Sequence, residues 1–265
     1  MKAHFKFLSF VSFVLAAALT GAWATPAADE IMMNSFLTSK VADSTTDVTF
    51  RLRTAAGQER IRLTSGPSKL LPGTTDNRRL ITFNAPADVK GTKTLLIEHS
   101  NAEDDMWIYL PAMKKVRRLV ASNKRDSFVG TDFSYGDVMG HKVADWKHAL
   151  LKEESCAGRE CYVIESLPRS RDIQDLSGYS KRVSWIDRES WVALRIDIYD
   201  STGELLKKIT TEDIQEVDPA NHKWQPMKQT SANVQTGHTT TLEFHNFKAN
   251  VGVSDNLFTA RALEN

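Results

Sequence analysis

The run Met106-Trp107-Ile108-Tyr109-Leu110 constrains the fold of this chain more than any other stretch. Successive side chains of a strand point to opposite faces, and a strand covered on one face alternates apolar with polar residues. Here apolar or aromatic side chains occupy both alternating positions, so both faces of the strand need apolar cover. Protein supplies that cover on both faces, or protein supplies it on one face and a ligand on the other.

Residues 114–120 predict the returning strand of a hairpin, because Pro111 and Ala112 interrupt the chain just before them. This strand carries four basic side chains, Lys114, Lys115, Arg117 and Arg118. One interpretation is a solvated hairpin edge whose charges oppose aggregation. The other is a basic patch that meets anionic lipid head groups or an acidic partner. The near-neutral charge of the surrounding chain favours the first interpretation.

The N-terminus has the pattern of a secretory signal peptide, with Lys2 and Lys6, an apolar core over residues 7–19 and an Ala-x-Ala end at residues 22–24. The core is shorter than the about 20 residues that span a bilayer. We therefore expect cleavage after Ala24 and an exported, periplasmic chain of residues 25–265 that folds as one domain.

The charge balance of the exported part argues against nucleic-acid binding. Without Lys2 and Lys6, the 34 Lys and Arg residues become 32 against 33 Asp and Glu, a formal charge of −1. A nucleic-acid binder would carry a basic excess.

Cys156 and Cys161 are the two cysteines of the chain. In an exported protein, a pair at this spacing predicts a structural disulfide that closes a small loop. Loop entropy gives such a bond ~2 kcal/mol of stabilisation. The spacing differs from a Cys-x-x-Cys redox pair, and a zinc site would need further ligands.

Short apolar runs with turn signals between them dominate the chain after a predicted helix at residues 29–41, and a further helical turn is expected at residues 172–176. Many short strands with few helices indicate a mainly β fold, either an antiparallel barrel or a curved sheet.

The motifs of common catalytic sites are missing from the sequence. It contains no His-Glu-x-x-His pattern, no Gly-x-Ser-x-Gly elbow, no phosphate-binding glycine loop and no cluster with zinc spacing. We therefore expect no enzyme activity, no metal and no cofactor.

The aromatic residues of the predicted strands suggest a binding function. A large curved sheet needs something on its concave face, and an apolar ligand is one solution. The residues that we expect to line such a cavity are Trp107, Tyr109, Leu110, Trp146, Val183, Trp185, Leu194 and Ile196.

The run from Met106 to Val138 resembles the signature of the LolA-like superfamily, in the clade of outer-membrane lipoprotein-sorting proteins. That group is similar in fold to the carriers LolA and LolB and to the periplasmic regulator RseB. Weaker matches follow in order at residues 161–165, 185–187, 224–226 and 258–264, so the resemblance spans roughly residues 29–264.

The resemblance implies an incomplete, open antiparallel barrel with a few helices across its mouth and an apolar cavity inside. It implies a carrier of lipid or lipoprotein acyl chains between the inner and outer membranes. It also implies an inner-membrane RND-type transporter and an outer-membrane acceptor as partners. The alternatives are an RseB-like sensor that binds a partner protein and, less favoured, a hydrolase acting on an envelope lipid.

The loop after the hairpin, residues 127–137, is our candidate for a gate or a partner contact. Three aromatic residues in such a loop would be costly to leave in water. Ser134 and Asp137 stand at the spacing of a capping box, which predicts a short helix. The gate candidates are Phe128, Phe133, Tyr135 and Asp137.

Overall fold

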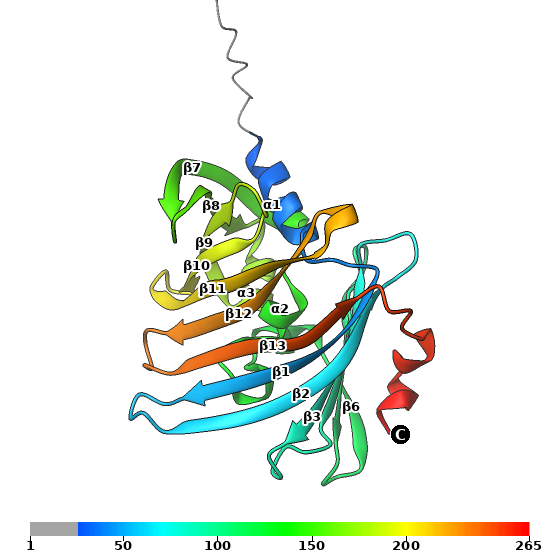
Figure 1. Cartoon of the computed structure of the whole chain (residues 1–265). Coiled ribbons are helices and arrows are strands. Elements are labelled where there is room, and N and C mark those ends of the chain that lie inside the picture. The colour runs from blue at the N-terminus through cyan, green and yellow to red at the C-terminus, as the bar shows by residue number, and fades with distance from the viewer. Residues whose placement is uncertain (1–25, 265) are drawn as a thin grey trace, which may run out of the picture.

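A computed structural model describes residues 26–264 of the chain, and the predicted signal peptide lies outside these residues. Thirteen strands form one antiparallel sheet in the order β6-β5-β4-β3-β2-β1-β13-β12-β11-β10-β9-β8-β7 (Figure 1). The sheet curves strongly, but its edge strands β6 and β7 do not pair with each other. The prediction of a mainly β, open antiparallel fold is therefore confirmed.

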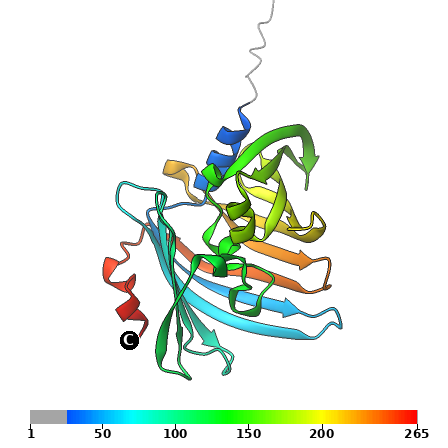
Figure 2. The same cartoon turned by 180° about the vertical axis from the view of Figure 1, so that it is seen from behind.

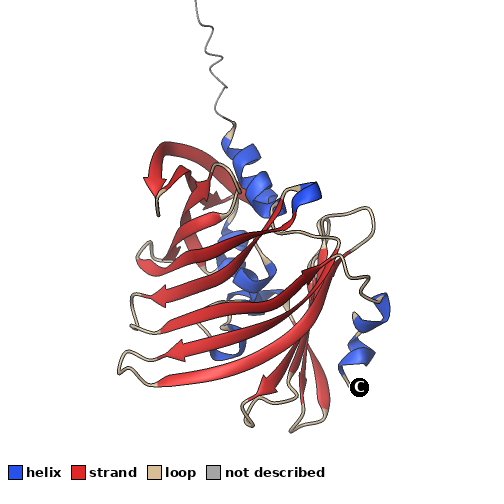
Figure 3. Cartoon of the chain, viewed as in Figure 1, coloured by secondary structure: helices blue, strands red, loops and turns tan. Residues whose placement is uncertain are grey.

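The strands are β1 (Asp43–Arg53), β2 (Glu59–Leu70), β3 (Asn77–Ala85), β4 (Lys93–Ile97), β5 (Asp105–Leu110), β6 (Lys115–Leu119), β7 (Trp146–Cys156), β8 (Arg159–Pro168), β9 (Tyr179–Asp187), β10 (Ala193–Asp200), β11 (Leu205–Asp218), β12 (Lys223–Asn233) and β13 (Thr239–Ala249). The helices are α1 (Ala28–Leu37), α2 (Tyr135–Met139) and α3 (Arg171–Ser177), with 3-10 turns η1 (Ala121–Arg125), η2 (Phe128–Gly130), η3 (Val143–Asp145), η4 (Pro219–Asn221), η5 (Asp255–Leu257) and η6 (Ala260–Leu263) (Figure 3).

Helices α1 and α3 lie at the two predicted helical segments, residues 29–41 and 172–176. Helix α1 begins one residue before the predicted start and ends four residues before the predicted end at residue 41. The predicted helical turn at residues 172–176 is α3. Within residues 26–264, none of the helices could span a bilayer.

The chain between β6 and β7 folds back into the concave side of the sheet (Figure 2). We call residues 121–141 of this connection the inner segment. It contains η1, η2 and α2, and its buried side chains join those of the sheet in the largest hydrophobic core. That core contains Phe50, Phe83, Leu96, Met106, Phe128, Phe133, Tyr135, Met139, Trp146, Tyr179, Ile198, Ile209 and Leu242.

The convex side of β3 to β6 is covered by the C-terminal turns η5 and η6 (Figure 1). Phe258 and Leu263 are buried there against Leu80 and Leu95. Helix α1 covers the other end of the sheet, where Ile31 packs with residues of β8 and β9 and is 0% exposed.

The hairpin that organises the sequence forms as predicted, with Met106 paired to Leu119 and Leu110 to Lys115. Met106 is 0% exposed in the concave core, whereas Trp107 and Tyr109 pack against the C-terminal cluster on the convex side. Protein therefore covers both faces of this strand.

Gly66 marks a close approach of β2 to β3. A Cβ atom at this position would lie 1.8 Å from the carbonyl oxygen of Leu80, which no side chain could tolerate. The lack of a Cβ atom lets the two strands approach closely at this point.

Candidate functional site

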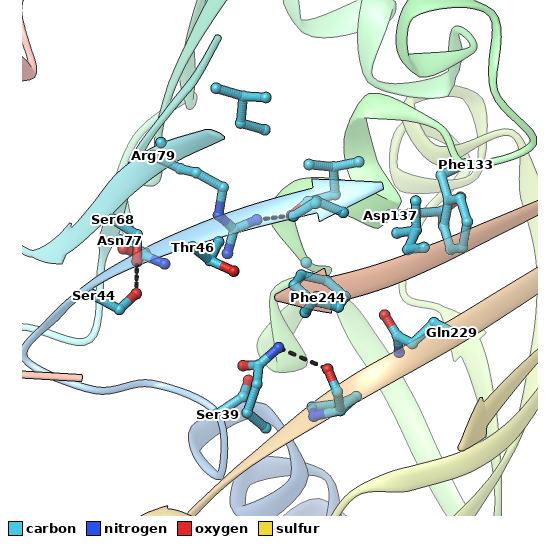
Figure 4. A pocket seen from close by; sticks show the side chains of 18 of the residues that line it. Ser39, Ser44, Thr46, Ser68, Asn77, Arg79, Phe133, Asp137, Gln229 and Phe244 are labelled. Carbon is cyan, nitrogen blue, oxygen red and sulfur yellow. Dashed lines mark hydrogen bonds between the residues drawn. The ribbon is translucent and has the colours of Figure 1, made fainter. Parts of the chain in front are cut away.

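A pocket of about 320 Å³ lies between the concave face of the sheet and the end of the inner segment (Figure 4). Its apolar wall includes Val48, Phe50, Ile81, Phe133, Val138, Ile196, Ile209, Leu242 and Phe244. Its polar wall includes Ser39, Ser44, Thr46, Ser68, Asn77, Arg79, Asp137, His141, Arg182 and Gln229. The pocket therefore offers both apolar surface and hydrogen-bonding groups.

A second pocket of about 270 Å³ extends the first one under α1, where Met32 and Phe36 line it. The two pockets share Arg79, Arg182 and Ile196 among their lining residues, so they adjoin. We call the two together the concave groove. Small-molecule sites measure about 300 to 1,000 Å³, and the groove falls in this range.

The aromatic residues of the inner segment are buried. Phe128 is 0% exposed, and its ring centroid lies 5.2 Å from that of Tyr135 and 6.1 and 6.3 Å from those of Phe83 and Phe50. Phe133 and Tyr135 are 4% and 6% exposed. The inner segment thus fills part of the space on the concave side of the sheet with its own side chains.

Side chains from four strands hold the inner segment by its backbone carbonyl groups. Arg62 of β2 donates to the carbonyl of Val129, and Arg79 of β3 donates to that of Val138. The carbonyl of Asp132 accepts from Lys207 Nζ of β11 at 2.8 Å and from Ser231 Oγ of β12 at 3.1 Å. The segment is therefore fixed to both halves of the sheet.

Asp137 forms the centre of this attachment. The predicted capping box is confirmed, since Asp137 accepts from the backbone N–H of Ser134 at 2.8 Å and donates its own N–H to Ser134 Oγ at 3.0 Å. The Asp137 carboxylate also accepts from Lys207 Nζ at 2.6 Å and from Tyr179 Oη at 3.0 Å. His141 Nε2 lies 3.3 Å from its second oxygen.

The charges in this cluster determine its protonation. Burial alone would raise the pKa of Asp137, but Lys207 and His141 outweigh burial and hold this pKa well below its usual range. Burial opposes the charge of Lys207, yet Asp137 raises the pKa of Lys207 above its ordinary value. Burial, together with Arg182, lowers the pKa of His141 to about 4. At neutral pH the cluster is an ion pair beside a neutral imidazole.

The predicted cavity residues lie in different parts of the fold. Ile196 lines the concave groove. Trp146 is 2% exposed within the concave core, and Trp107 and Tyr109 pack under the C-terminal turns. Leu194 is buried and Leu110 is half-buried, and neither lines the groove.

Val183 and Trp185 lie on the convex face of β9. Their neighbours Arg182 and Ser184 line the groove, and adjacent residues of a strand point to opposite faces. Trp185 Nε1 donates to Glu154 at 2.6 Å on that convex side. That these residues contact a lipid stays a prediction.

The sequence did not point to Arg79, His141 and Arg182, which line the groove, or to Lys207, which pairs with Asp137 at its wall. A signal for Arg182 existed in the alternation of β9, where Arg182, Ser184 and Ile186 share one face. The prediction instead took Val183 and Trp185, on the other face of this strand, as cavity residues.

The predicted basic patch is exposed. Lys114 lies in the turn before β6, and Lys115, Arg117 and Arg118 lie on this edge strand. Arg118 Nη2 donates to Asp105 at 2.5 Å. The edge position agrees with the interpretation as a solvated hairpin edge, and contact with anionic head groups or an acidic partner stays a prediction.

Cys156 and Cys161 are free thiols in the structure. They lie on neighbouring strands, because Cys156 pairs with Arg159 and Cys161 with Glu154 around the turn between β7 and β8. Burial raises the pKa of the Cys161 thiol to about 12. The disulfide stays a prediction. Within residues 26–264, no group of three or more His, Cys, Asp or Glu side chains could hold a metal ion.

Comparison with known proteins places the chain in a family. A family model described only as an uncharacterized protein matches residues 75–265. No curated protein matches the chain.

Among solved structures, a domain from Vibrio parahaemolyticus described as an outer membrane lipoprotein-sorting protein is 29% identical, with a TM-score of 0.82 over 90% of this chain and 98% of that one. A DUF1329 family protein from Desulfovibrio piger is also 29% identical, with a TM-score of 0.82 over 89% and 97% of the two chains. A LolA superfamily protein from Nitrosomonas europaea shares the fold, at 18% identity and a TM-score of 0.68 over 89% and 98%.

Proposed function

Because this chain belongs to the family whose model matches residues 75–265 and shares its fold with a LolA superfamily protein, we propose that it is a periplasmic carrier that binds the acyl chain of a lipid or lipoprotein in the concave groove. The observation that carries this proposal is the groove itself, which an open curved sheet leaves between its concave face, α1 and the inner segment. No bond is made or broken in this function, and no cofactor takes part.

The apolar wall of the groove supplies the free energy of binding. Burying an acyl chain is worth about 0.8 kcal/mol for each CH₂ group, so a groove that shelters several such groups competes with a membrane for the chain. This wall is built by side chains of three strands: Val48 of β1, Ile196 of β10, and Leu242 and Phe244 of β13. Such a wall recognises an alkyl chain without requiring one particular chain length.

Release of the ligand requires a second conformation or an acceptor with higher affinity. We propose that the inner segment, with Phe128, Phe133, Tyr135 and Asp137, is the gate. Its opening would break the hydrogen bonds from Lys207 and Ser231 to Asp132. A donor such as an RND-type inner-membrane transporter and an outer-membrane acceptor complete the proposed shuttle.

Native mass spectrometry of protein isolated from the periplasm tests the proposal. We expect a fraction of the protein to carry a bound lipid, and the purified protein to bind a fluorescent fatty acid. The replacement Ile196→Trp should weaken that binding by about tenfold or more, because an indole occupies the groove.

The matched control is Ile61→Trp, since Ile61 is 42% exposed and lies outside the groove. Circular dichroism of both variants confirms that they fold. Unchanged fatty-acid binding by folded Ile196→Trp would remove the groove as the binding site. A protein isolated with a stable protein partner and no lipid would favour an RseB-like sensor instead.

A further inference from the structure

The concave groove holds more positive than negative charge. Lys207 is paired with Asp137 at 2.6 Å, and Lys40 is paired with Glu98 at 2.5 Å. Arg79 and Arg182 line both pockets of the groove, and neither forms an ion pair with a carboxylate of residues 26–264. Two guanidinium groups therefore face the groove outside ion-pair distance of a carboxylate, and the acidic groups that act on them, Glu98 on Arg79 and Asp137 on Arg182, are already paired with Lys40 and Lys207.

Of the two arginines, Arg182 has fewer hydrogen-bond partners. Its Nε atom is buried without a hydrogen bond, and its guanidinium carbon lies 5.6 Å from the ring centroid of Trp146. Two further polar atoms of the groove wall, Ser184 Oγ and Asn77 Oδ1, are also buried without a partner. Buried polar atoms are usually hydrogen-bonded, so this wall has two donors without a partner, Arg182 Nε and Ser184 Oγ, and one acceptor without a partner, Asn77 Oδ1.

Arg79 uses one Nη1 donor on the carbonyl of Val138, while a guanidinium has five N–H donors. Burial lowers the pKa of both Arg79 and Arg182, which reflects the cost of keeping these charges away from water. An unpaired buried charge is strongly unfavourable, and an anion that pairs with it removes that penalty.

We propose that Arg79 and Arg182 bind the ionised head of an amphiphile, a carboxylate or a phosphate, whose alkyl chain lies along the apolar wall of the groove. The proposal rests on the proposed function and specifies its ligand class. Arg79 comes from β3 and Arg182 from β9, so the head group would lie on the concave side of the sheet between these two strands. Planar guanidinium groups match both anions through paired N–H donors.

This arrangement discriminates between lipids by their charge. A neutral head, such as an alcohol or an ester, leaves both guanidinium groups unpaired. The groove therefore favours a free anionic lipid over an acyl chain that is esterified to an uncharged anchor.

Isothermal titration calorimetry of the full mature protein with dodecanoate, dodecyl phosphate and dodecanol tests this inference. We expect at least one of the two anions to bind about tenfold or more tightly than dodecanol, the range of charge-assisted hydrogen bonds. A preference between the two anions supports the inference and identifies the head group.

The variants Arg79→Gln and Arg182→Gln should each lose most of the difference in affinity between anion and alcohol. Arg182→Lys, which keeps the charge, should retain part of the difference. The matched control is Lys181→Gln, which removes a positive charge from the opposite face of β9, where Lys181 Nζ lies 4.2 Å from the ring centroid of Tyr199.

Two outcomes separate this inference from the proposed function. Equal binding of dodecanol and both anions by the unaltered protein overturns the anionic-head inference and leaves an acyl-chain carrier. Absence of binding by all three compounds overturns the proposed function and the inference with it. Both comparisons use the unaltered protein, so they hold even if an arginine variant fails to fold.

Discussion

The carboxylate of Asp137 accepts a 2.6 Å hydrogen bond from Lys207 Nζ, and these side chains are 4% and 5% exposed. The pair joins α2 of the inner segment to β11 of the sheet, 70 residues further along the chain. It stands at one wall of the concave groove, which Asp137 itself lines. The attachment of the inner segment and the shape of the groove therefore depend on the same ion pair.

Breaking this pair should strongly destabilise the protein. We expect Lys207→Met to lower the free energy of unfolding by about 3 to 5 kcal/mol, because Asp137 would stay buried without its cation. The double variant Asp137→Asn/Lys207→Met should recover part of this loss. Guanidinium unfolding followed by tryptophan fluorescence measures both. A loss under about 1 kcal/mol for Lys207→Met would contradict the assigned role.

Stability should decrease when the pH is lowered from 6.5 to about 4, because of His141. Its pKa is lowered from 6.5 in the unfolded chain to about 4 by burial and by Arg182. Between these values the unfolded state binds a proton that the folded state does not, so stability falls with decreasing pH, by about 3 kcal/mol at most. The pKa of Asp137 is lowered, so its carboxylate stays charged across this window and adds little to the slope.

Unfolding titrations at several pH values test this dependence, with His141→Gln as the comparison. The variant should show a clearly smaller slope between pH 6.5 and 4. An equal slope in the two proteins would assign the effect to other groups.

Phe128 should be among the residues most sensitive to truncation. Phe128→Ala removes a ring that is 0% exposed and packs against three aromatic rings, so we expect a loss of about 3 to 5 kcal/mol. Val120→Ala, at a side chain that is 64% exposed nearby, should change stability by less than about 0.5 kcal/mol. Chemical unfolding of both variants makes the comparison. Similar small effects would mean that the inner segment is not packed as described.

The C-terminal cover should stabilise the hairpin of β5 and β6 from the convex side. Phe258 is 5% exposed and lies 5.0 Å from the guanidinium carbon of Arg78. We expect Phe258→Ala to cost about 3 kcal/mol and to increase binding of a hydrophobic dye, because Leu80 and Leu95 lose their cover. Leu257→Ala, at a side chain that is 41% exposed on the same segment, should change neither measurement.

The predicted disulfide can be tested in protein taken from an oxidising compartment. We expect the intact mass to be lower than that of the reduced protein by two hydrogens, and reduction to cost ~2 kcal/mol of stability. Burial raises the pKa of Cys161 to about 12, so thiol labelling must be done in denaturant. Labelling of both cysteines without prior reduction would remove the prediction.

Local patterns predicted the local structure well. The hairpin of β5 and β6 and the capping box of Ser134 and Asp137 both follow from residues that interact within one turn or one strand pair. Propensity, turn residues and spacing determine such features, and distant parts of the chain change them little.

The groove was harder to predict because it depends on which face of each strand becomes concave. Alternation in β9 separated Val183 and Trp185 from Arg182 and Ser184, but it did not say which pair would face inward. Aromatic side chains were expected inside, yet Trp107 and Tyr109 are covered by residues 255–263, which lie more than a hundred positions away.

Local sequence patterns were enough to predict short antiparallel strands, a doubly covered strand at residues 106–110 and a short helix capped by Ser134. Long-range packing, in contrast, sets three features: the inner segment fills part of the concave side, Asp137 pairs with Lys207, and Arg79 and Arg182 face the remaining space. This difference arises because strand alternation defines two faces, whereas the curvature of the sheet and contacts between distant segments determine which face encloses a groove.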